Sequence, residues 1–288
     1  MPVAPSRALV SLTEPDEVVC LISDRNFQAV GNYYGDFSPT SDEDVLQLLG
    51  AAAKRRRHAP ADVRAGGDED VEIPSGGVRL RGTLHLPVPC AGIVVFAHGS
   101  GSGRHSPRNR LVASVLQGAG LGTLLLDLLT PSEEINRENV FDVALLARRL
   151  TAATQWLGTR EDTATSAIGY FGASTGAGAA LWAAAAHGSR VAAIVSRGGR
   201  PDLAGPRLAA VRAPTLLIVG SADPQVLTLN RQAMALMRAP TRLEVIRGAT
   251  HLFEEPGTLT QAAALAAEWF VRYLVPAGMA RPAAETGM

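Results

Sequence analysis

The sequence predicts an α/β fold in which a mostly parallel sheet is covered by helices. From about residue 69, short apolar runs alternate with longer stretches of helical spacing. Most of these runs are apolar throughout, as expected of strands buried on both faces. The chain has 288 residues, of which 47% are hydrophobic, so a sizeable core is possible.

The predicted strands begin with an antiparallel pair and continue as buried runs. Residues 78–86 alternate apolar and polar side chains and pair with residues 71–73. The buried runs are 93–97, 122–126, 167–171, 191–195, 215–219 and 243–246. Helical spacing predicts helices over about 109–118, 140–157, 174–187, 224–237 and 258–274. Because the strands at 191–195 and 215–219 are so close in sequence, we expect no large lid domain between them.

The composition and patterning of the sequence predict three parts: a leading segment, residues 1–66, a domain, residues 67–274, and a flexible tail, residues 275–288. Ser41 starts a predicted helix in the leading segment. The basic run at 54–57 is interpreted as a solvated helix end that leads into a linker, with a nucleic-acid patch as the alternative.

Composition narrows the class of protein. Lys+Arg and Asp+Glu both number 27, which argues against a nucleic-acid binder. Cys20 and Cys90 are the only cysteines, which supports neither a disulfide framework nor a zinc site. We find neither a secretory signal nor a run long enough to span a membrane, and we expect a cytoplasmic protein. The sequence predicts no particular oligomeric state.

A nucleophile motif follows the run at 167–171. It is the G-x-S-x-G sequence Gly172-Ala173-Ser174-Thr175-Gly176, placed before an Ala-rich helix. In such a turn the serine is strained, and the small residues on either side prevent backbone collisions. The alternative is a Gly-rich structural turn, but the strand before and the helix after favour Ser174 as a nucleophile.

A serine nucleophile needs a histidine base oriented by a carboxylate. Asp223 follows the strand at 215–219 and His251 follows the strand at 243–246, which gives the chain order Ser, Asp, His. Asp127, which follows its own strand, is the competing acid. Glu254 and Glu255 are near His251 in sequence, but neighbours in one loop seldom orient the ring.

Acyl transfer also needs N–H donors for the oxyanion. The Gly-rich loop that begins at His98 follows the strand at 93–97 and predicts Ser100 as one donor, with Gly101 as the alternative. The backbone N–H of Thr175 is the second. We interpret His98 as a residue that braces the loop. Phosphate binding is the other reading of such a loop, but the spacing of a phosphate loop is absent.

Basic side chains gather on the loops at the predicted mouth of the site. Arginine binds carboxylate or phosphate well, so they suggest an anionic substrate or leaving group. The alternative is that they face solvent or, for those near Asp202, pair with that carboxylate. The candidates are Arg104, His105, Arg108, Arg197 and Arg200.

These motifs resemble the α/β-hydrolase fold, and their details resemble a bacterial subgroup of the dienelactone hydrolase-like family. The resemblance covers residues 69–274 and rests on the phrases HGSGSGRHSPRNR, LLLDLLTP, GYFGASTGAGAAL, VSRGGRPDLAG and GATHLFEEPG. It implies an eight-strand sheet, no metal or organic cofactor, and cleavage of a carboxylic ester or lactone. Dienelactone hydrolases use cysteine where this chain has Ser174, so activity on dienelactone itself is not expected.

Residues 17–49 resemble the C-terminal end of a phosphoribosyltransferase, which often precedes the hydrolase in that subgroup. The strand that binds phosphoribosyl pyrophosphate in such domains has no counterpart here, so we expect no transferase activity. The segment is expected to pack on the hydrolase or to complete a partner's surface.

The sequence therefore predicts a serine hydrolase acting through an acyl-enzyme on a small-molecule ester or lactone. The alternatives are an acyltransferase or biosynthetic cyclase that uses the same triad, or a binding module whose site is idle.

Overall fold

The computed structural model describes residues 3–5, 22–24, 27, 67–186 and 188–275 of the chain. Two compact units are present, Met1–Ala61 and Asp62–Met288. In the first, strands β1 (Val3–Pro5) and β2 (Ile22–Asp24) pair in parallel. The helix predicted from Ser41, the basic run and the tail beyond residue 275 lie outside the described residues.

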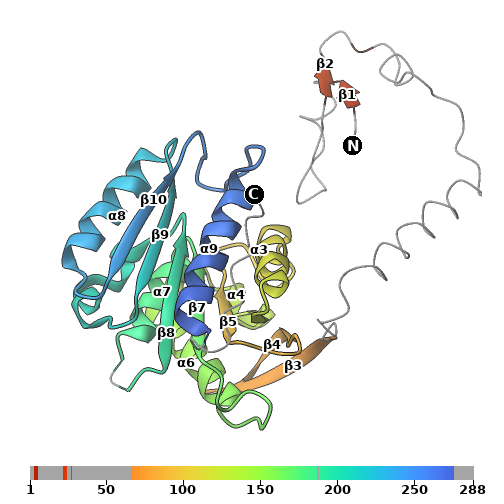
Figure 1. Ribbon diagram of the computed structural model, residues 1–288, viewed down its shortest axis with the longest axis vertical. Helices are drawn as coiled ribbons and strands as arrows, with labels where there is room; N and C mark the ends of the chain where they lie inside the picture. Colours follow the sequence, from red (N-terminus) through yellow and green to blue (C-terminus); the bar gives the residue numbers. More distant parts are fainter. Residues whose placement is uncertain (1–2, 6–21, 25–26, 28–66, 187, 276–288) are drawn as a thin grey trace, which may run out of the picture. The chain divides into compact units, whose positions relative to one another are not determined.

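The second unit is built on an eight-stranded sheet of order β10-β9-β8-β7-β5-β6-β4-β3 (Figure 1). Its strands are β3 (Asp68–Ser75), β4 (Val78–His85), β5 (Ile93–Ala97), β6 (Gly122–Leu126), β7 (Ile168–Ala173), β8 (Val191–Arg197), β9 (Thr215–Gly220) and β10 (Thr241–Ile246). β4 is antiparallel to both β3 and β6, and the other neighbours are parallel. The predicted mostly parallel sheet with an antiparallel start is confirmed.

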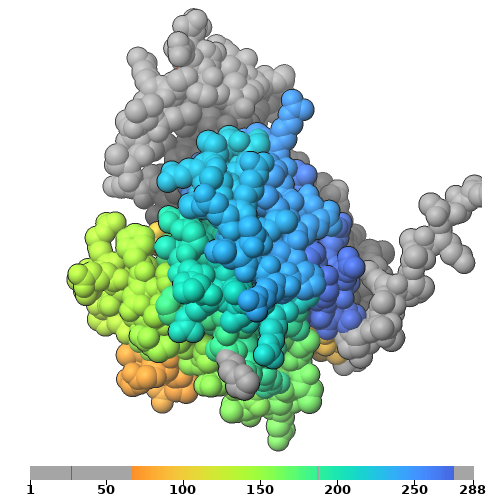
Figure 2. Space-filling model, turned by 90° about the vertical axis from the view of Figure 1, so that its left-hand side faces the viewer, coloured from red at the N-terminus to blue at the C-terminus, as the bar shows by residue number. Residues whose placement is uncertain are grey.

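Helices cover both faces of this sheet (Figure 1). They are α3 (Pro107–Gly118), α4 (Pro131–Glu134), α5 (Arg137–Phe141), α6 (Val143–Leu157), α7 (Thr175–Ala184), the 3₁₀ segment η2 (Pro201–Ala210), α8 (Pro224–Leu236) and α9 (Thr258–Leu274). Figure 2 shows the face where α8 and the edge strand β10 lie. Among the described residues, no helix has both the length and the apolar character needed to cross a membrane.

The sheet divides the core into two parts, because successive side chains of a strand point to opposite faces of the sheet. In β5, Ile93 and Val95 belong to one buried cluster, which they share with α6 and α7. Val94 and Phe96 belong to the opposite cluster, which they share with α3 and α9. This is why β5 is apolar throughout.

One predicted helix, residues 140–157, is wrong in its boundary. The structure has two helices there, because Asp142 leaves helical geometry (φ −73°, ψ 86°) and its side chain accepts a 2.9 Å hydrogen bond from the N–H of Leu145. An aspartate that caps a helix in this way competes with continuation of the preceding turn.

The strand order places a crevice at the carboxyl ends of β5 and β7. The connection after β5 leads to β6 on one side, and the chain then crosses back to β7 on the other. The loops after β5 and β7 therefore leave in opposite directions, which opens the space where ligands gather in sheets of this kind.

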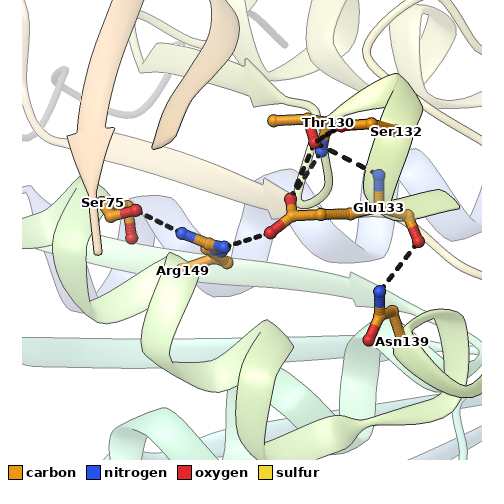
Figure 3. Close-up of polar contacts among 6 residues, drawn as sticks. All are labelled: Ser75, Thr130, Ser132, Glu133, Asn139 and Arg149. Atoms are coloured by element: carbon orange, nitrogen blue, oxygen red, sulfur yellow. Dashed lines mark hydrogen bonds and ion pairs between the residues drawn. The ribbon is translucent and has the colours of Figure 1, made fainter. Parts of the chain in front are cut away.

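A polar cluster outside this crevice ties the first hairpin to the helical layer (Figure 3). Arg149 of α6 is buried, donates to the backbone carbonyl of Ser75 and lies 2.6 Å from Glu133. Glu133 also forms a capping box with Thr130, and its backbone carbonyl accepts a 2.9 Å bond from Asn139. Burial raises the pKa of the Glu133 carboxyl, but the bonds from Thr130 and the charge of Arg149 outweigh it and hold that pKa below its ordinary value.

We predict that Glu133→Gln lowers the free energy of unfolding by about 1–3 kcal/mol at pH 7, because it leaves a buried guanidinium without its counter-charge. A carboxyl whose pKa falls on folding stabilises fully above its ordinary pKa of 4.5, and that stabilisation is lost as pH falls through the folded-state value. Urea unfolding at pH 7 and pH 3.5 should show the gap between variant and wild type narrowing. Glu134→Gln, at the exposed neighbour, is the matched control; an equal gap at both pH values would contradict the prediction.

Candidate active site

Ser174 occupies a strained turn between β7 and α7. Its backbone has φ 49° and ψ −122°, a conformation that a residue with a side chain rarely adopts. A Cβ on Gly172 would lie 2.4 Å from the Cα of Ala177, and one on Gly176 would lie 2.1 Å from the carbonyl oxygen of Ala97. Both glycines of the motif are therefore required by close backbone approach.

The structure places the predicted nucleophile, base and acid in succession, each within hydrogen-bond distance of the next. The Oγ of Ser174 lies 3.3 Å from Nε2 of His251, and Nδ1 of His251 lies 2.8 Å from Oδ2 of Asp223. A carboxylate can only accept, so Nδ1 carries the proton and Nε2 is free to accept from the serine hydroxyl. This tautomer is the one that a general base needs.

Asp223 is held by its own helix. It is the N-cap of α8, and its Oδ1 accepts a 3.3 Å bond from the N–H of Val226 while Oδ2 faces His251. The two nearby acids turn elsewhere: Glu255 accepts from the N–H of Thr250, and Glu254 lies 3.6 Å from Arg108.

The loop after β5 lies against the nucleophile. A Cβ on Gly99 would lie 3.0 Å from the Cβ of Ser174. Ser100 lines the cavity above the serine, whereas Gly101, with φ +70°, does not. Thr175 is the first residue of α7, so its N–H has no helical acceptor of its own. The predicted donors thus lie on two segments next to Ser174: Ser100 on the loop after β5 and Thr175 at the start of α7.

The cavity has a volume of about 160 Å³, and none of the described residues that line it carries a carboxylate. Its lining consists of small, polar and basic residues and one leucine, from the ends of β7 and β8, the loops after β5, β7, β8 and β10, and the start of α3. They are Gly99, Ser100, Ser102, Ser106, Arg108, Asn109, Ala173, Ser174, Arg197, Gly198, His251 and Leu252. Ser106 is the N-cap of α3, so the start of that helix also faces the cavity.

The predicted basic residues divide into two groups. Arg108 and Arg197 line the cavity. The others are not part of its lining: Arg104 lies 3.4 Å from Asp127, His105 lies between Arg104 and Arg110, and Arg200 forms two bonds to Asp202.

Arg197, the last residue of β8, is buried beside Ser174. Its guanidinium lies 5.5 Å from the ring of Phe253, and among the described residues its Nε has no hydrogen-bond partner. Burial lowers the pKa of Arg197 to about 10, and repulsion from Arg108 contributes. At neutral pH it remains a cation.

Sequence reasoning missed several residues of this site. Phe253 holds a positive φ of 58° and packs its buried ring against Arg197. Ser106 and Asn109 enter the cavity because α3 begins there; Ser before Pro107 was a signal for that helix start. Phe253 carried no comparable signal, since an aromatic residue two positions after a histidine reads as ordinary core.

Comparison with known proteins shows which family the chain is similar to. The sequence model of the dienelactone hydrolase family matches residues 131–274. A crystal structure of dienelactone hydrolase from Anabaena variabilis is 54% identical with a TM-score of 0.72, and covers 73% of this chain and 100% of its own. Est1E from Butyrivibrio proteoclasticus, 15% identical with a TM-score of 0.60 over 70% of this chain and 98% of its own, shares the fold alone. These likenesses confirm the α/β-hydrolase fold.

A curated relative places the chain in a longer context. A protein of Mycobacterium tuberculosis, whose name assigns it to the phosphoribosyl transferases, is 56% identical over 267 residues. The match covers 91% of this chain and 60% of that protein, so the chain spans about three fifths of the relative's length. The relative's name fits the expectation that a phosphoribosyltransferase precedes the hydrolase in this subgroup. The family match and the identity to a fully covered solved member together show that this chain belongs to the dienelactone hydrolase family.

Proposed function

We propose that this chain is a serine hydrolase that cleaves a carboxylic ester or lactone through Ser174. The observation that carries the proposal is the line of contacts from Ser174 through His251 to Asp223, at 3.3 and 2.8 Å. Membership of a hydrolase family supports the reaction class. The serine nucleophile is proposed from the geometry of the site, and the carboxylic ester or lactone from the family resemblance.

In the first step the Oγ of Ser174 attacks the substrate carbonyl while Nε2 of His251 takes its proton. The imidazolium that forms is stabilised by Asp223, which stays ionised. The negative charge on the former carbonyl oxygen is held by the N–H groups of Ser100 and Thr175. The intermediate then collapses: His251 returns the proton to the alcohol oxygen, which leaves, and Ser174 keeps the acyl group.

In the second step water replaces the alcohol. His251 takes a proton from the attacking water, the same N–H groups hold the second oxyanion, and Ser174 leaves with the proton from His251. Since the side chain of His251 is 38% exposed, water reaches the base directly.

Two other functions are compatible with the fold. An acyltransferase or cyclase uses the same acyl-enzyme and an alcohol or amine in place of water. An idle binding module would need no catalytic geometry. A strained serine with an oriented base at 3.3 Å argues against the idle module, because no structural need brings these three side chains together.

The cavity favours a substrate with an anionic group. Arg108 and Arg197 line it, no described carboxylate does, and Arg197 is buried with its Nε unpaired among the described residues. A buried cation without a counter-charge is costly, and a carboxylate offers the bidentate acceptor that a guanidinium fits. We therefore propose that Arg197 and Arg108 bind a negative group of the substrate beside the scissile bond.

We predict that Ser174→Ala lowers kcat for p-nitrophenyl acetate by about 10³-fold or more, because it removes the nucleophile. The wild type should also gain one adduct from a neutral fluorophosphonate, read by intact mass, and the variant none. Ser114→Ala, on the exposed side of α3, is the control and should behave as wild type. Undiminished turnover by Ser174→Ala would reject the proposed nucleophile. Added alcohol or amine acceptors distinguish transfer from hydrolysis by the acyl product.

We predict that Arg197→Met raises KM for the monoester of a short dicarboxylic acid at least about tenfold, and changes KM for the matching neutral ester by less than about threefold. Arg108→Gln, at a partly exposed position, should show the same selectivity to a smaller degree. The matched control is Arg110→Gln, which removes the same charge from the same helix outside the cavity lining. Equal effects on the charged and neutral esters would count against an anion site.

A further inference from the structure

Asp127 is the one strand-end acid of the predicted site that the triad leaves unused. It follows β6, and its backbone N–H bonds the carbonyl of Arg81 in β4. Its carboxylate turns toward the loop after β5, residues 98–106, which we call the oxyanion loop because it contains the proposed donor Ser100.

The first fastening of the oxyanion loop is His98. Its Nε2 lies 3.0 Å from the backbone N–H of Leu128 and accepts from it, so Nδ1 carries the proton and donates to the carbonyl of Gly99 at 2.9 Å. Burial lowers the pKa of His98, which keeps the ring in this neutral form. The start of the loop is thus tied to the strand exit that contains Asp127.

The second fastening is Asp127 itself. Its Oδ1 accepts a 2.7 Å bond from the backbone N–H of Arg104, and its Oδ2 lies 3.4 Å from Nε of the same residue. A Cβ on Gly103 would lie 2.8 Å from Oδ1, so the carboxylate rests directly on the loop backbone. A short bond to a carboxylate is among the stronger hydrogen bonds in proteins.

The stretch between these fastenings is the part of the loop that faces the substrate. Ser100 and Ser102 line the cavity, and Gly101 between them has φ +70°, a conformation with little steric restraint for glycine. Such a stretch does not hold its own backbone N–H groups in one position. An oxyanion donor stabilises the transition state only if it is already in place, so the restraint has to come from the ends.

We infer that Asp127 is a positioning residue of the reaction: its carboxylate holds the Arg104 end of the oxyanion loop and thereby fixes the N–H of Ser100 over Ser174. The inference rests on the proposed function, since it assigns Asp127 a role in that chemistry. Asp127 is not among the residues that line the cavity. It acts through the loop.

The test compares Asp127→Ala with Asp127→Asn in the full chain. The alanine variant should lose about 10- to 100-fold in kcat on a neutral ester with KM changed less than threefold, because the loss falls on the oxyanion. The asparagine variant retains an oxygen that accepts from Arg104 and should recover most of the rate. Hydrogen–deuterium exchange over residues 99–106 should be faster in the alanine variant and close to wild type in the asparagine variant.

Two further variants separate positioning from general damage. Asp142→Ala removes another aspartate that accepts a backbone N–H, at the start of α6, and should lower Tm without changing kcat. Gly103→Ala pushes a methyl group against Oδ1 while the carboxylate stays, and should reproduce part of the alanine defect; it decides the question if Asp127→Ala does not fold.

The outcomes are distinguishable. A wild-type protein that neither hydrolyses esters nor takes a fluorophosphonate rejects the proposed function and this role with it. An active wild type with an equally active Asp127→Ala, or with Gly103→Ala at wild-type kcat where the alanine variant does not fold, overturns the role of Asp127 alone. So does an asparagine variant as slow as the alanine variant, because the accepting oxygen would then not matter.

Discussion

The site depends on the close approach of the turn after β7 to the end of β5. At Gly176 the helix start is so near the carbonyl of Ala97 that a single methyl group has no room. This contact holds the first turn of α7 against the end of β5, and Ser174, just before that turn, lines the cavity. The strain at Ser174 is stable only because the strand before it and the helix after it are both fixed by a fully buried core. Apolar packing therefore determines where the hydroxyl lies.

Every other functional group is placed relative to that turn. Asp223 and His251 come from the exits of β9 and β10, the oxyanion loop from β5, and Arg197 from β8. Parallel strands deliver all these exits to one edge of the sheet, so residues far apart in sequence meet without a dedicated scaffold. Backbone strain is concentrated there as well. Among the described residues, the two non-glycine positions with positive φ are Ser174, which lines the cavity, and Phe253, whose ring packs against the cavity-lining Arg197.

Much of this was predictable from the sequence because it follows from local rules. Strands buried on both faces are mostly apolar, and the turn at Ser174 has room only for glycine at positions 172 and 176. Both features can therefore be recognised from residue types alone. The break at Asp142 was missed because the apolar spacing continues across it, and the cap is one side chain among many polar ones. The sequence offered an ion pair with Asp202 as an alternative, and Arg200 forms it, but the sequence could not decide which arginine would remain without a carboxylate. Whether Arg200 or Arg197 takes the carboxylate of Asp202 depends on where two side chains lie after folding, and no periodicity records that.

The pairing of the charges explains how a chain with 27 basic and 27 acidic residues can have a positive site. Arg104, Arg149, Arg160 and Arg200 each lie beside a carboxylate. At the cavity, Glu254 is 3.6 Å from the partly exposed Arg108, whereas Arg197, the more deeply buried of the two, has no ion pair within the described residues. Burial disfavours the charged form of Arg197, yet a pKa of about 10 keeps it charged at neutral pH. The fold thus retains an unfavourable charge at the place where a substrate would enter. A negative group bound there would relieve a cost already present in the free protein, so its binding would gain more than the same contact made at the surface.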